Sequence, residues 1–362
     1  MNDEKQVEMK TILIILDGAS EEKIQELGNK TPLEYARTPV LVEITRCGHH
    51  TNSKFYPAGR TPDSLNCTLS ILGVNASLIP VNRAYLEAVA AGINIGDTEV
   101  AFRCNLVSIK NGKLHSFNGM GLSSEEMKFL SQNIKSIDGV KFHHVSGYRN
   151  ILAVEKNKLN GLLKNMPPHE NVGAQFNELS DNLKNVDLLY EFAVKNKLTY
   201  EDADYMFYPW GISEKVELPS FQELHNKTCS CICHAEIIKG IAKSMDIDVP
   251  VLKNSTGDVD TDLREKAAVV LQELKSHDVV IAHINGTDEA SHRRDLYGKI
   301  KFIEKVDREF LSPIYASVNN QVKIIVLADH QTSSISGKHE KGSVDVIINQ
   351  MHQYNNFISL TM

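Results

Sequence analysis

The sequence predicts an α/β fold: a mostly parallel sheet with helices on both faces, carrying an inserted α+β lid domain. Two observations support this prediction. Short apolar runs rich in β-branched residues recur at 11–16, 278–284, 322–328 and 344–348, and such runs, bounded by turn residues, are typical of strands buried in a parallel sheet. Helical patterns separate the later runs, which indicates alternation of strands and helices.

The first run, TILIIL, ends directly in Asp17 and Gly18. The later strands are separated by amphipathic patterns at 235–245 and 261–275, and by a segment at 298–311 that is rich in charge pairs at helical spacing. These three segments are predicted helices that connect the strands of one sheet.

The middle of the chain has a different pattern, with short alternating strands and fewer apolar runs. The predicted strands are 100–109, 113–118, 142–145 and 149–154, and the predicted helices are 123–136 and 182–195. We therefore predict a discontinuous phosphotransferase-type domain at 1–96 and 201–362, with an α+β substrate or lid domain inserted at 97–200. The segment Pro209-Trp210-Gly211 marks the return to the first domain.

Composition excludes several classes of partner. The 362 residues include 39 Lys and Arg against 46 Asp and Glu, which gives a formal net charge of −7. A nucleic-acid or anionic-membrane binder needs a basic face, so neither partner is expected. The first ten residues are polar and contain no apolar core of a signal peptide, so we expect a cytoplasmic protein. The oligomeric state is not set by the sequence.

Three cysteines alternate along one segment, at Cys229, Cys231 and Cys233. On a strand all three side chains would share one face. Structural zinc usually uses a wider spacing of ligands, so buried thiols in a strand are the favoured interpretation and a metal site is the alternative.

Metal-ligating residue types follow the apolar runs. In an open parallel sheet, ligands bind beyond the carboxyl ends of the strands. The residues expected at this edge are Asp17, Asp288, His292, Asp329, His330 and His339. Mixed Asp and His ligation suits Zn²⁺ or Mn²⁺ and, less well, Mg²⁺. Six ligands exceed the need of one tetrahedral ion, so we expect two divalent ions. Taken singly, each motif is more often a polar turn, a solvated helix face or a solvent-exposed loop, and the joint occurrence of the motifs at strand ends favours the metal site.

Ser64 is the candidate nucleophile. It precedes an apolar helical run and therefore lies at a predicted helix N-terminus. A serine there commonly caps the helix. The same geometry would also stabilise a phosphate through the helix amides and dipole, and a nearby metal would activate the hydroxyl.

Taken together, these residues resemble the alkaline phosphatase superfamily of metalloenzymes. They most resemble the archaeal-type cofactor-independent phosphoglycerate mutases and their homoserine kinase-like relatives. The resemblance extends from about residue 10 to residue 348. The stretches that carry it are IILDG at 14–18, KTPLEYARTP at 30–39, LSILG at 69–73, EVAFRCN at 99–105, IKGIA at 238–242, DTD at 260–262, DEASH at 288–292 and IEKVDRE at 303–309, with Ser64, Asp329, His330 and His339.

The resemblance implies specific roles. One ion would be held by Asp17, Ser64, Asp329 and His330, and the other by Asp288, His292 and His339. Ser64 would be the phosphorylated nucleophile, and Lys299 would match a family position that neutralises the phosphoryl group. Two ions about 3.5–4 Å apart would stabilise the attacking and leaving oxygens. The implied activity is interconversion of 3- and 2-phosphoglycerate without 2,3-bisphosphoglycerate.

Three arginines are candidates for binding the anionic groups of a small phosphorylated substrate: Arg83, Arg103 and Arg149. Guanidinium groups match phosphate and carboxylate geometry. Arg103 is the strongest candidate because it lies in the matching motif AFRCN. A surface salt bridge is the alternative interpretation for each.

The surroundings of the predicted substrate differ from the family pattern, whereas the metal positions do not. The differences are at Leu65-Asn66, Asn82-Arg83-Ala84-Tyr85, Thr332-Ser333-Ser334 and Gly342-Ser343-Val344-Asp345. The alternative functions are therefore a divergent, homoserine kinase-like phosphotransferase or a phosphatase acting on another small metabolite, and a catalytically silent binding protein that keeps the metals.

Overall fold

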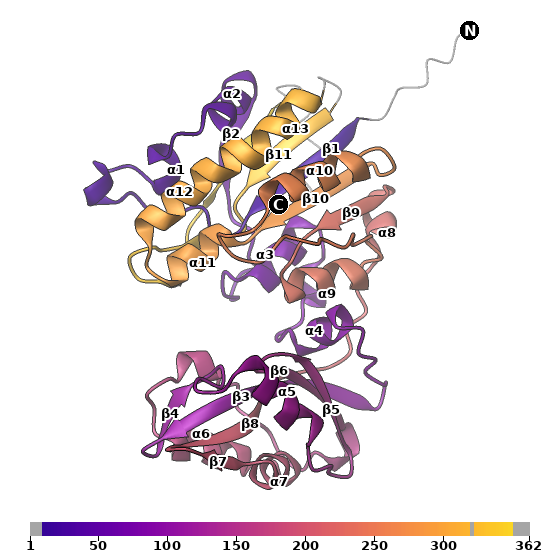
Figure 1. Ribbon diagram of the computed structural model, residues 1–362. Coiled ribbons are helices and arrows are strands. Elements are labelled where there is room, and N and C mark those ends of the chain that lie inside the picture. The colour runs from indigo at the N-terminus through magenta and orange to yellow at the C-terminus, as the bar shows by residue number, and fades with distance from the viewer. Residues whose placement is uncertain (1–8, 319–321, 350–362) are drawn as a thin grey trace. The chain divides into compact units, whose positions relative to one another are not determined.

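The computed structural model describes residues 9–318 and 322–349 (Figure 1). The chain divides into two compact units. Unit 1 comprises the chain up to Ile79 and from Leu218 onward, and unit 2 comprises Pro80–Glu217. Unit 2 therefore extends beyond the predicted insertion at 97–200 on both sides.

A six-stranded sheet forms the centre of unit 1. Its strand order is β2-β14-β11-β1-β10-β9. The strands are β1 Lys10–Leu16, β2 His49–Ser53, β9 Cys229–Ile232, β10 Val279–Ile284, β11 Val322–Leu327 and β14 Val344–Ile348. The four strands β9, β10, β1 and β11 are parallel. Every residue of β1 except Lys10 is buried, as expected of a strand with covered faces on both sides. The predicted α/β fold is confirmed.

Strand β14 runs antiparallel to β11, with Leu327 opposite Val346. Its apolar pattern resembles that of the parallel strands, but it is reached from β11 by a loop containing only the short hairpin of β12 (Gln331–Thr332) and β13 (His339–Glu340). A parallel return usually contains a crossover helix, and this loop has none. The antiparallel direction places the residues before β14, His339 among them, at the carboxyl edge of the parallel strands.

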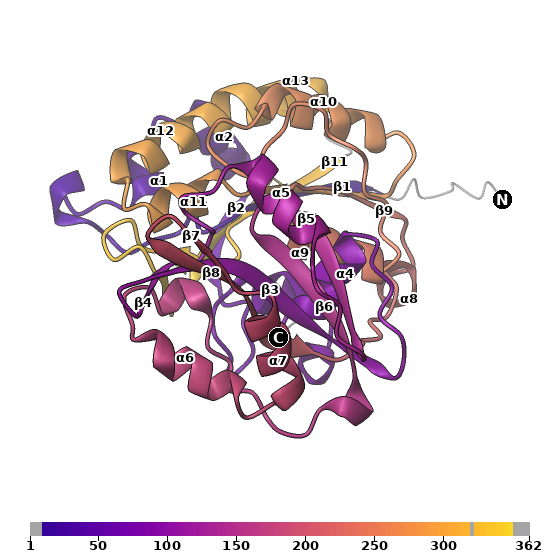
Figure 2. The ribbon, with the colours of Figure 1, turned by 60° about the horizontal axis from the view of Figure 1, so that its bottom comes forward.

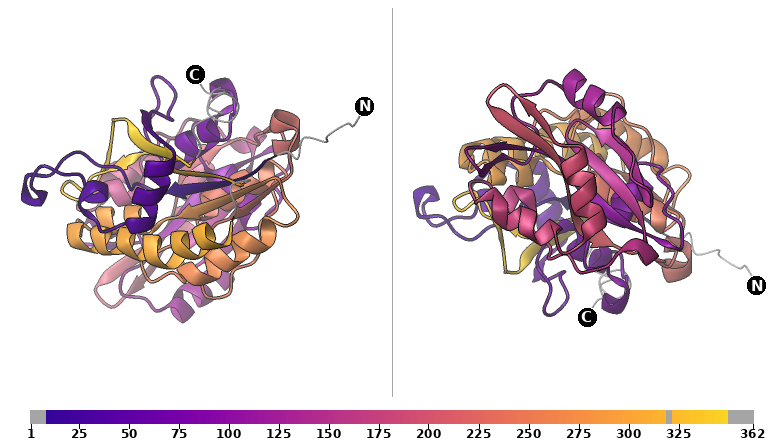
Figure 3. Two further views of the ribbon diagram at one scale, coloured as in Figure 1. Left: turned by 90° about the horizontal axis from the view of Figure 1, so that it is seen from above. Right: turned by 90° about the horizontal axis from the view of Figure 1, so that it is seen from below.

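Helices complete unit 1. They are α1 Pro32–Tyr35, α2 Pro39–Cys47, α3 Ser64–Ile71, α8 Phe221–His225, α9 Glu236–Ser244, α10 Leu263–Glu273, α11 Gly286–His292, α12 Leu296–Val306 and α13 Ser312–Ser317, with single turns at Gln25–Leu27 and Ala76–Leu78. The helices α10, α12 and α13 lie together along the sheet in Figure 1 and in the left panel of Figure 3.

The predicted helix at 298–311 differs from the observed one. Helix α12 begins earlier, at Leu296, and is followed by a π-helical turn at Asp307–Leu311. In this turn the buried carboxylate of Asp307 accepts hydrogen bonds from the amides of Val40, at 3.2 Å, and Leu41, at 2.8 Å. Asp307 therefore supplies the N-terminal cap that Thr38 does not give to α2.

Unit 2 contains an antiparallel sheet of order β5-β6-β3-β8-β7, with β4 paired to β3 (Figure 2). The strands are β3 Glu99–Lys110, β4 Lys113–Ser116, β5 Val140–Ser146, β6 Arg149–Glu155, β7 Leu198–Tyr200 and β8 Ala203–Ser213. Its helices are α4 Ala84–Ala90, α5 Ser124–Gln132, α6 Phe176–Leu183 and α7 Asp187–Lys195, with single turns at Lys156–Lys158 and Pro168–Glu170. The predicted helix at 182–195 is thus two helices.

Strand β8 was not predicted, because Pro209-Trp210-Gly211 was interpreted as a break. Proline is rare inside a sheet because it cannot donate to the ladder. Pro209 lies opposite Cys104, and the pairing register between β3 and β8 shifts nearby, between Ala101 and Arg103. This irregularity accommodates the proline and keeps β8 in the centre of unit 2.

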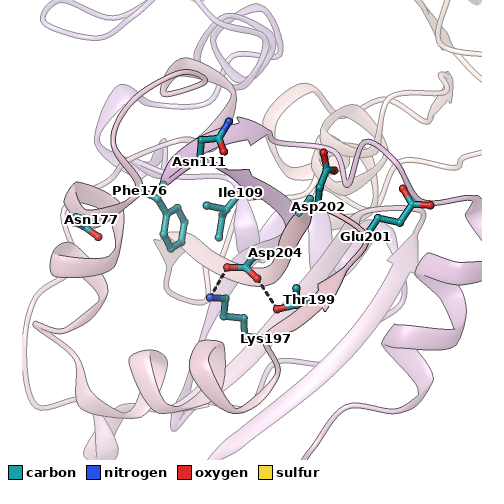
Figure 4. Close-up of a pocket in the computed structure, with 11 residues that line it drawn as sticks. Ile109, Asn111, Phe176, Asn177, Lys197, Thr199, Glu201, Asp202 and Asp204 are labelled. Carbon is teal, nitrogen blue, oxygen red and sulfur yellow. Dashed lines mark hydrogen bonds and ion pairs between the residues drawn. The ribbon is translucent and has the colours of Figure 1, made fainter.

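A cavity of about 420 Å³ lies in unit 2 between the end of β3, the start of α6 and the β7–β8 hairpin (Figure 4). Its lining includes an ion pair between Lys197 and Asp204, at 2.6 Å, and Thr199 donates to the same carboxylate. None of the predicted site residues lines this cavity. Within the described residues, no helix is both long and apolar enough to cross a membrane.

Candidate metal centre

The buried half of the candidate centre contains Asp17, Asp329 and His330. Asp17 directly follows β1, and the other two residues follow β11 on the neighbouring strand. His330 Nε2 lies 3.3 Å from Asp17 Oδ1 and 3.4 Å from Asp329 Oδ2. All three residues are buried. Two adjacent parallel strands therefore bring together three side chains of types that can ligate a metal ion.

The second half contains Asp288, His292 and His339. The first two residues lie one turn apart on α11, and His339 begins β13. Asp288 Oδ2 lies 3.1 Å from His292 Nε2, and Asp288 Oδ1 lies 3.4 Å from His339 Nε2. The rings of His339 and His330 have centroids 4.1 Å apart, so the two groups are adjacent.

Burial and mutual repulsion control ionisation in the buried half. Burial, followed by the charges of Asp329 and Asp288, raises the pKa of Asp17 well above its usual value. Burial also lowers the pKa of His330, which favours the neutral imidazole. A neutral imidazole with carboxylates is the ligand state that a divalent ion needs.

The second half is electrostatically different. Burial acts to raise the pKa of Asp288, but hydrogen bonds to His292 and His339 lower it well below its usual value. The hydrogen bond to Asp288 raises the pKa of His292 to about 9. His292 Nδ1 lies 2.9 Å from the carbonyl oxygen of Gly337. Because a carbonyl can only accept, Nδ1 carries the hydrogen and Nε2 is directed at Asp288, as in metal sites whose histidines are oriented by a backbone carbonyl.

Both groups fit a divalent cation. In each group the ligand atoms lie within 4.8 Å of one another. Asp17 Oδ1 and Asp329 Oδ2 are buried and form no hydrogen bond with the described residues. Buried carboxylate oxygens without partners are costly unless a cation neutralises them. The donor set of Asp and His suits Mn²⁺ or Zn²⁺.

Ser64 is the first residue of α3, and Asp63 rather than Ser64 caps the helix by accepting from the amide of Asn66. The hydroxyl of Ser64 is therefore not used for capping. Its Oγ lies 3.3 Å from His330 Nε2. The structure thus brings the candidate nucleophile to the buried half of the centre.

Lys299 is buried, and its ammonium group forms an ion pair with Glu21 at 2.9 Å. It also donates to the carbonyl oxygen of Thr332 at 2.8 Å. Burial lowers the pKa of Lys299, although Glu21 opposes this effect. The predicted interaction of Lys299 with a phosphoryl group stays a prediction, and the observed contacts anchor the loop that carries His330.

Sequence reasoning missed several polar residues that support the centre. Asn285 donates to Asp17 Oδ2 at 3.0 Å, and His283 Nε2 lies 3.6 Å from the same oxygen. Thr287 donates to the backbone oxygen of Asp17. The signal for His283 was present, because it is the one polar residue in the apolar strand β10. Glu21 and Thr332 gave no such signal, because both lie in polar loops.

The three candidate arginines cluster in unit 2. Glu87 on α4 accepts from Arg83 Nε at 3.1 Å and from Arg103 Nε at 2.8 Å. Arg103 also lies over the ring of Trp210, 4.2 Å from its centroid, and Arg149 lies over Tyr148. Burial lowers the pKa of Arg103 to about 10, and the charges of Arg83 and Arg149 act in the same direction. One glutamate, Glu87, is therefore paired with two guanidinium groups, and the charge of Arg149 acts on one of them, Arg103.

The cysteines Cys229, Cys231 and Cys233 are buried free thiols at strand β9. Burial raises the pKa of Cys229 above its usual value. Among the described residues, the groups with metal-site geometry contain no cysteine. This agrees with the interpretation of buried strand thiols.

Comparison with known proteins places the chain in a class. Residues 9–359 match the family described as the Metalloenzyme superfamily. The match covers nearly the whole chain, so the chain belongs to the metalloenzyme superfamily, which includes alkaline phosphatase. It is an enzyme of that superfamily.

Individual relatives show which members of the superfamily this chain is similar to. A 2,3-bisphosphoglycerate-independent phosphoglycerate mutase of Methanosarcina acetivorans is 30% identical over 359 residues, covering 94% of this chain and 90% of the relative. A mutase of the same description from Methanothrix thermoacetophila is also 30% identical, with 90% and 86% covered. The chain is thus a homologue of the archaeal-type cofactor-independent phosphoglycerate mutases.

Solved structures share the fold. The PH0037 protein of Pyrococcus horikoshii aligns with a TM-score of 0.76 at 23% identity, covering 94% of this chain and 87% of that protein. A cofactor-independent phosphoglycerate mutase of Thermoplasma acidophilum aligns with a TM-score of 0.57 at 18% identity, covering 97% and 95%.

Proposed function

We propose that the chain is a metal-dependent phosphoglycerate mutase that interconverts 3- and 2-phosphoglycerate through phosphorylated Ser64. The observation that carries this proposal is the position of Ser64. Its hydroxyl begins α3 and lies 3.3 Å from His330, beside two buried carboxylates, each with one oxygen that lacks a hydrogen-bond partner among the described residues. The homology to cofactor-independent mutases supports the same activity.

The proposed ion sites follow the two groups of ligands. Asp17, Asp329 and His330, with Ser64, would hold one divalent ion, and Asp288, His292 and His339 would hold the other. When bound, the ions supply Lewis-acid stabilisation of charge on the attacking and leaving oxygens. Mn²⁺ and Zn²⁺ are the preferred candidates for this donor set, with Mg²⁺ next.

Within this proposal, Ser64 Oγ forms the new bond to phosphorus while the substrate oxygen leaves. The other hydroxyl of the retained glycerate then takes the phosphoryl group back, which restores Ser64. The start of α3 favours this exchange, because backbone amides and the helix dipole stabilise phosphate oxygens. Water must be excluded between the two transfers, or phosphoserine would be hydrolysed.

The arginines of unit 2 would bind the remaining anionic groups of the substrate. Arg103 is held by Glu87 through Nε and by the face of Trp210, so its terminal nitrogens are oriented in advance. A fixed guanidinium fork suits a carboxylate or phosphate. The roles of Lys299 at the phosphoryl group and of unit 2 as a lid belong to this proposal, as does a cytoplasmic location.

A mutase assay tests the proposal. Metal-free protein is given Mn²⁺, Zn²⁺ or Mg²⁺ and 3-phosphoglycerate without 2,3-bisphosphoglycerate, and 2-phosphoglycerate is measured by enolase coupling. We expect turnover with at least one ion and none with excess chelator. Metal-loaded protein that converts neither isomer contradicts the proposal.

A second candidate is phosphotransfer to or from another small metabolite. The differences from the family pattern at Leu65-Asn66 and Asn82-Arg83-Ala84-Tyr85 favour it. A screen of phosphorylated hydroxy acids for phosphate release, and of homoserine for ATP consumption, separates it from the mutase.

A further inference from the structure

The hydroxyl of Thr332 lies between the two groups of predicted ligands. Thr332 Oγ1 lies 2.6 Å from Asp288 Oδ1 in one group and 3.1 Å from His330 Nδ1 in the other. Among the described residues, Thr332 is fully buried. A single side chain therefore contacts one predicted ligand of each ion.

The directions of these two hydrogen bonds follow from the number of hydrogens. Thr332 Oγ1 donates its single hydroxyl hydrogen to Asp288 Oδ1, because a carboxylate oxygen accepts. The oxygen of Thr332 must then accept from His330, which places the imidazole hydrogen on Nδ1. Nε2 of His330 then carries no hydrogen, and its lone pair lies on the side of the ring where Asp17 and Asp329 are.

The backbone of Thr332 is held from two sides. Its amide donates to the backbone oxygen of Ser20 at 3.2 Å, and its own carbonyl oxygen accepts from Lys299 at 2.8 Å. Lys299 is in turn paired with Glu21, whose other carboxylate oxygen accepts from the amide of Ser334 at 2.6 Å. Because these partners are buried, the position of the Thr332 hydroxyl is fixed before any ion binds.

Gly18 confirms how closely this arrangement is packed. Gly18 has a φ of +61°, and a Cβ atom there would lie 2.5 Å from Thr332 Oγ1 and 2.7 Å from Asp288 Oδ1. The hydrogen bond between Thr332 and Asp288 thus lies directly against the residue that follows Asp17. No larger residue fits beside it.

We propose that Thr332 is a positioning residue that couples the two ion sites by fixing the ring of His330 and the carboxylate of Asp288 together. This inference rests on the proposed pair of ion sites. Outer partners of metal ligands typically affect metal affinity by 10–100-fold. Because the one hydroxyl contacts a ligand of each ion, its loss weakens both sites together.

The test compares metal-free wild-type protein with Thr332→Val, which removes the hydroxyl at nearly constant shape, and Thr332→Ser, which keeps it. The matched control is Thr68→Val, because Thr68 is also a buried threonine but its hydroxyl has no hydrogen-bond partner among the described residues. Calorimetric titration with Mn²⁺ measures the affinity and the number of sites. Circular dichroism of the metal-free proteins shows that each variant is folded.

We expect Thr332→Val to weaken both Mn²⁺ sites by about 10–100-fold, with Thr332→Ser and Thr68→Val close to wild type. The ¹⁵N spectrum of metal-free protein should place the His330 hydrogen on Nδ1 in the wild type and lose that preference in Thr332→Val. Unchanged affinities, weakening of one site alone, or equal effects of Val and Ser overturn the inference. If the wild-type protein does not bind two Mn²⁺ ions, the proposed function is contradicted instead.

Discussion

The two units concentrate opposite charges by different means. Unit 1 collects carboxylates and imidazoles where parallel strands end, whereas unit 2 collects guanidinium groups from a helix start, Arg83, and from neighbouring strands, Arg103 and Arg149. Parallel strands bring their carboxyl ends to one edge by topology alone. In an antiparallel sheet, convergence depends instead on pairing register, here Arg103 opposite Ile151 and Asn105 opposite Arg149.

This contrast teaches why the first region was easier to predict. A residue that follows an apolar run is assigned to the edge without knowledge of register. The arginines could be selected by chemistry and by the AFRCN motif. The contacts of Arg103 with Glu87 and with the ring of Trp210, however, depend on the packing of α4, β3 and β8.

The largest expected effect concerns Ser64, the proposed nucleophile in unit 1. Ser64→Ala should reduce mutase turnover by about 10³–10⁶-fold, because removal of a catalytic nucleophile has effects of this order. Binding of Mn²⁺ should weaken less, since three protein ligands of the buried half remain. Steady-state kinetics and metal titration measure the two effects.

The matched control is Ser70→Ala in the same helix, whose hydroxyl only donates to the carbonyl oxygen of Asn66. It should retain turnover. Substantial mutase activity in Ser64→Ala would contradict the proposed role of Ser64 as the nucleophile.

A buried lysine in unit 1, Lys266, allows the cost of burying a positive charge to be tested. Lys266 is fully buried, and its Nζ donates to the carbonyl oxygen of His283 at a long 3.4 Å. Burial lowers its pKa from 10.5 to about 8. At 1.36 kcal/mol for each pH unit, Lys266→Met should raise the unfolding free energy by ~3 kcal/mol below pH 8.

The dependence on pH has a definite sign. Below about pH 8 the lysine is charged in both states, so the folded protein carries the full cost of burial. Between pH 8 and 10.5 the folded lysine loses its proton first, the wild type gains stability, and the advantage of Lys266→Met shrinks. Urea unfolding of metal-free protein over this range measures the difference. Lys184→Met, at an exposed ion pair with Asp181, should change stability by less than ~1 kcal/mol.

The smallest expected effect concerns the anion-binding region of unit 2. Arg103→Lys should raise KM for phosphoglycerate by about 10–100-fold, because a hydrogen bond to a charged group contributes about 1.5–3 kcal/mol and lysine lacks the guanidinium fork. The value of kcat should change less. Kinetics at saturating metal separate the two parameters.

Arg46→Lys is the matched control, because Arg46 is exposed and, within the part of the chain that the structure describes, pairs with Glu43 and Cys47 of its own helix. It should leave KM unchanged. If Arg103→Lys also leaves KM unchanged, the guanidinium cluster is a structural ion pair and the contrast between the units loses its functional meaning.

Much of the fold and of the candidate centre could be predicted from the sequence. The elements and residues that were not predicted have physical reasons. The strands β1, β10 and β11 were predictable because burial on both faces leaves an apolar run. Strand β8 was obscured by Pro209, and the direction of β14 is not encoded in its apolar pattern. Glu21 and Thr332 act through contacts between distant loops, which spacing along the chain does not reveal.

The antiparallel return through β14 has a consequence for how this enzyme can change. The loop between β11 and β14 supplies Asp329 and His330 to one group of ligands, His339 to the other, and Thr332 to both. The length of this loop is therefore constrained by the positions of both groups. An insertion or deletion in this loop is therefore expected to displace both groups of predicted ligands at once.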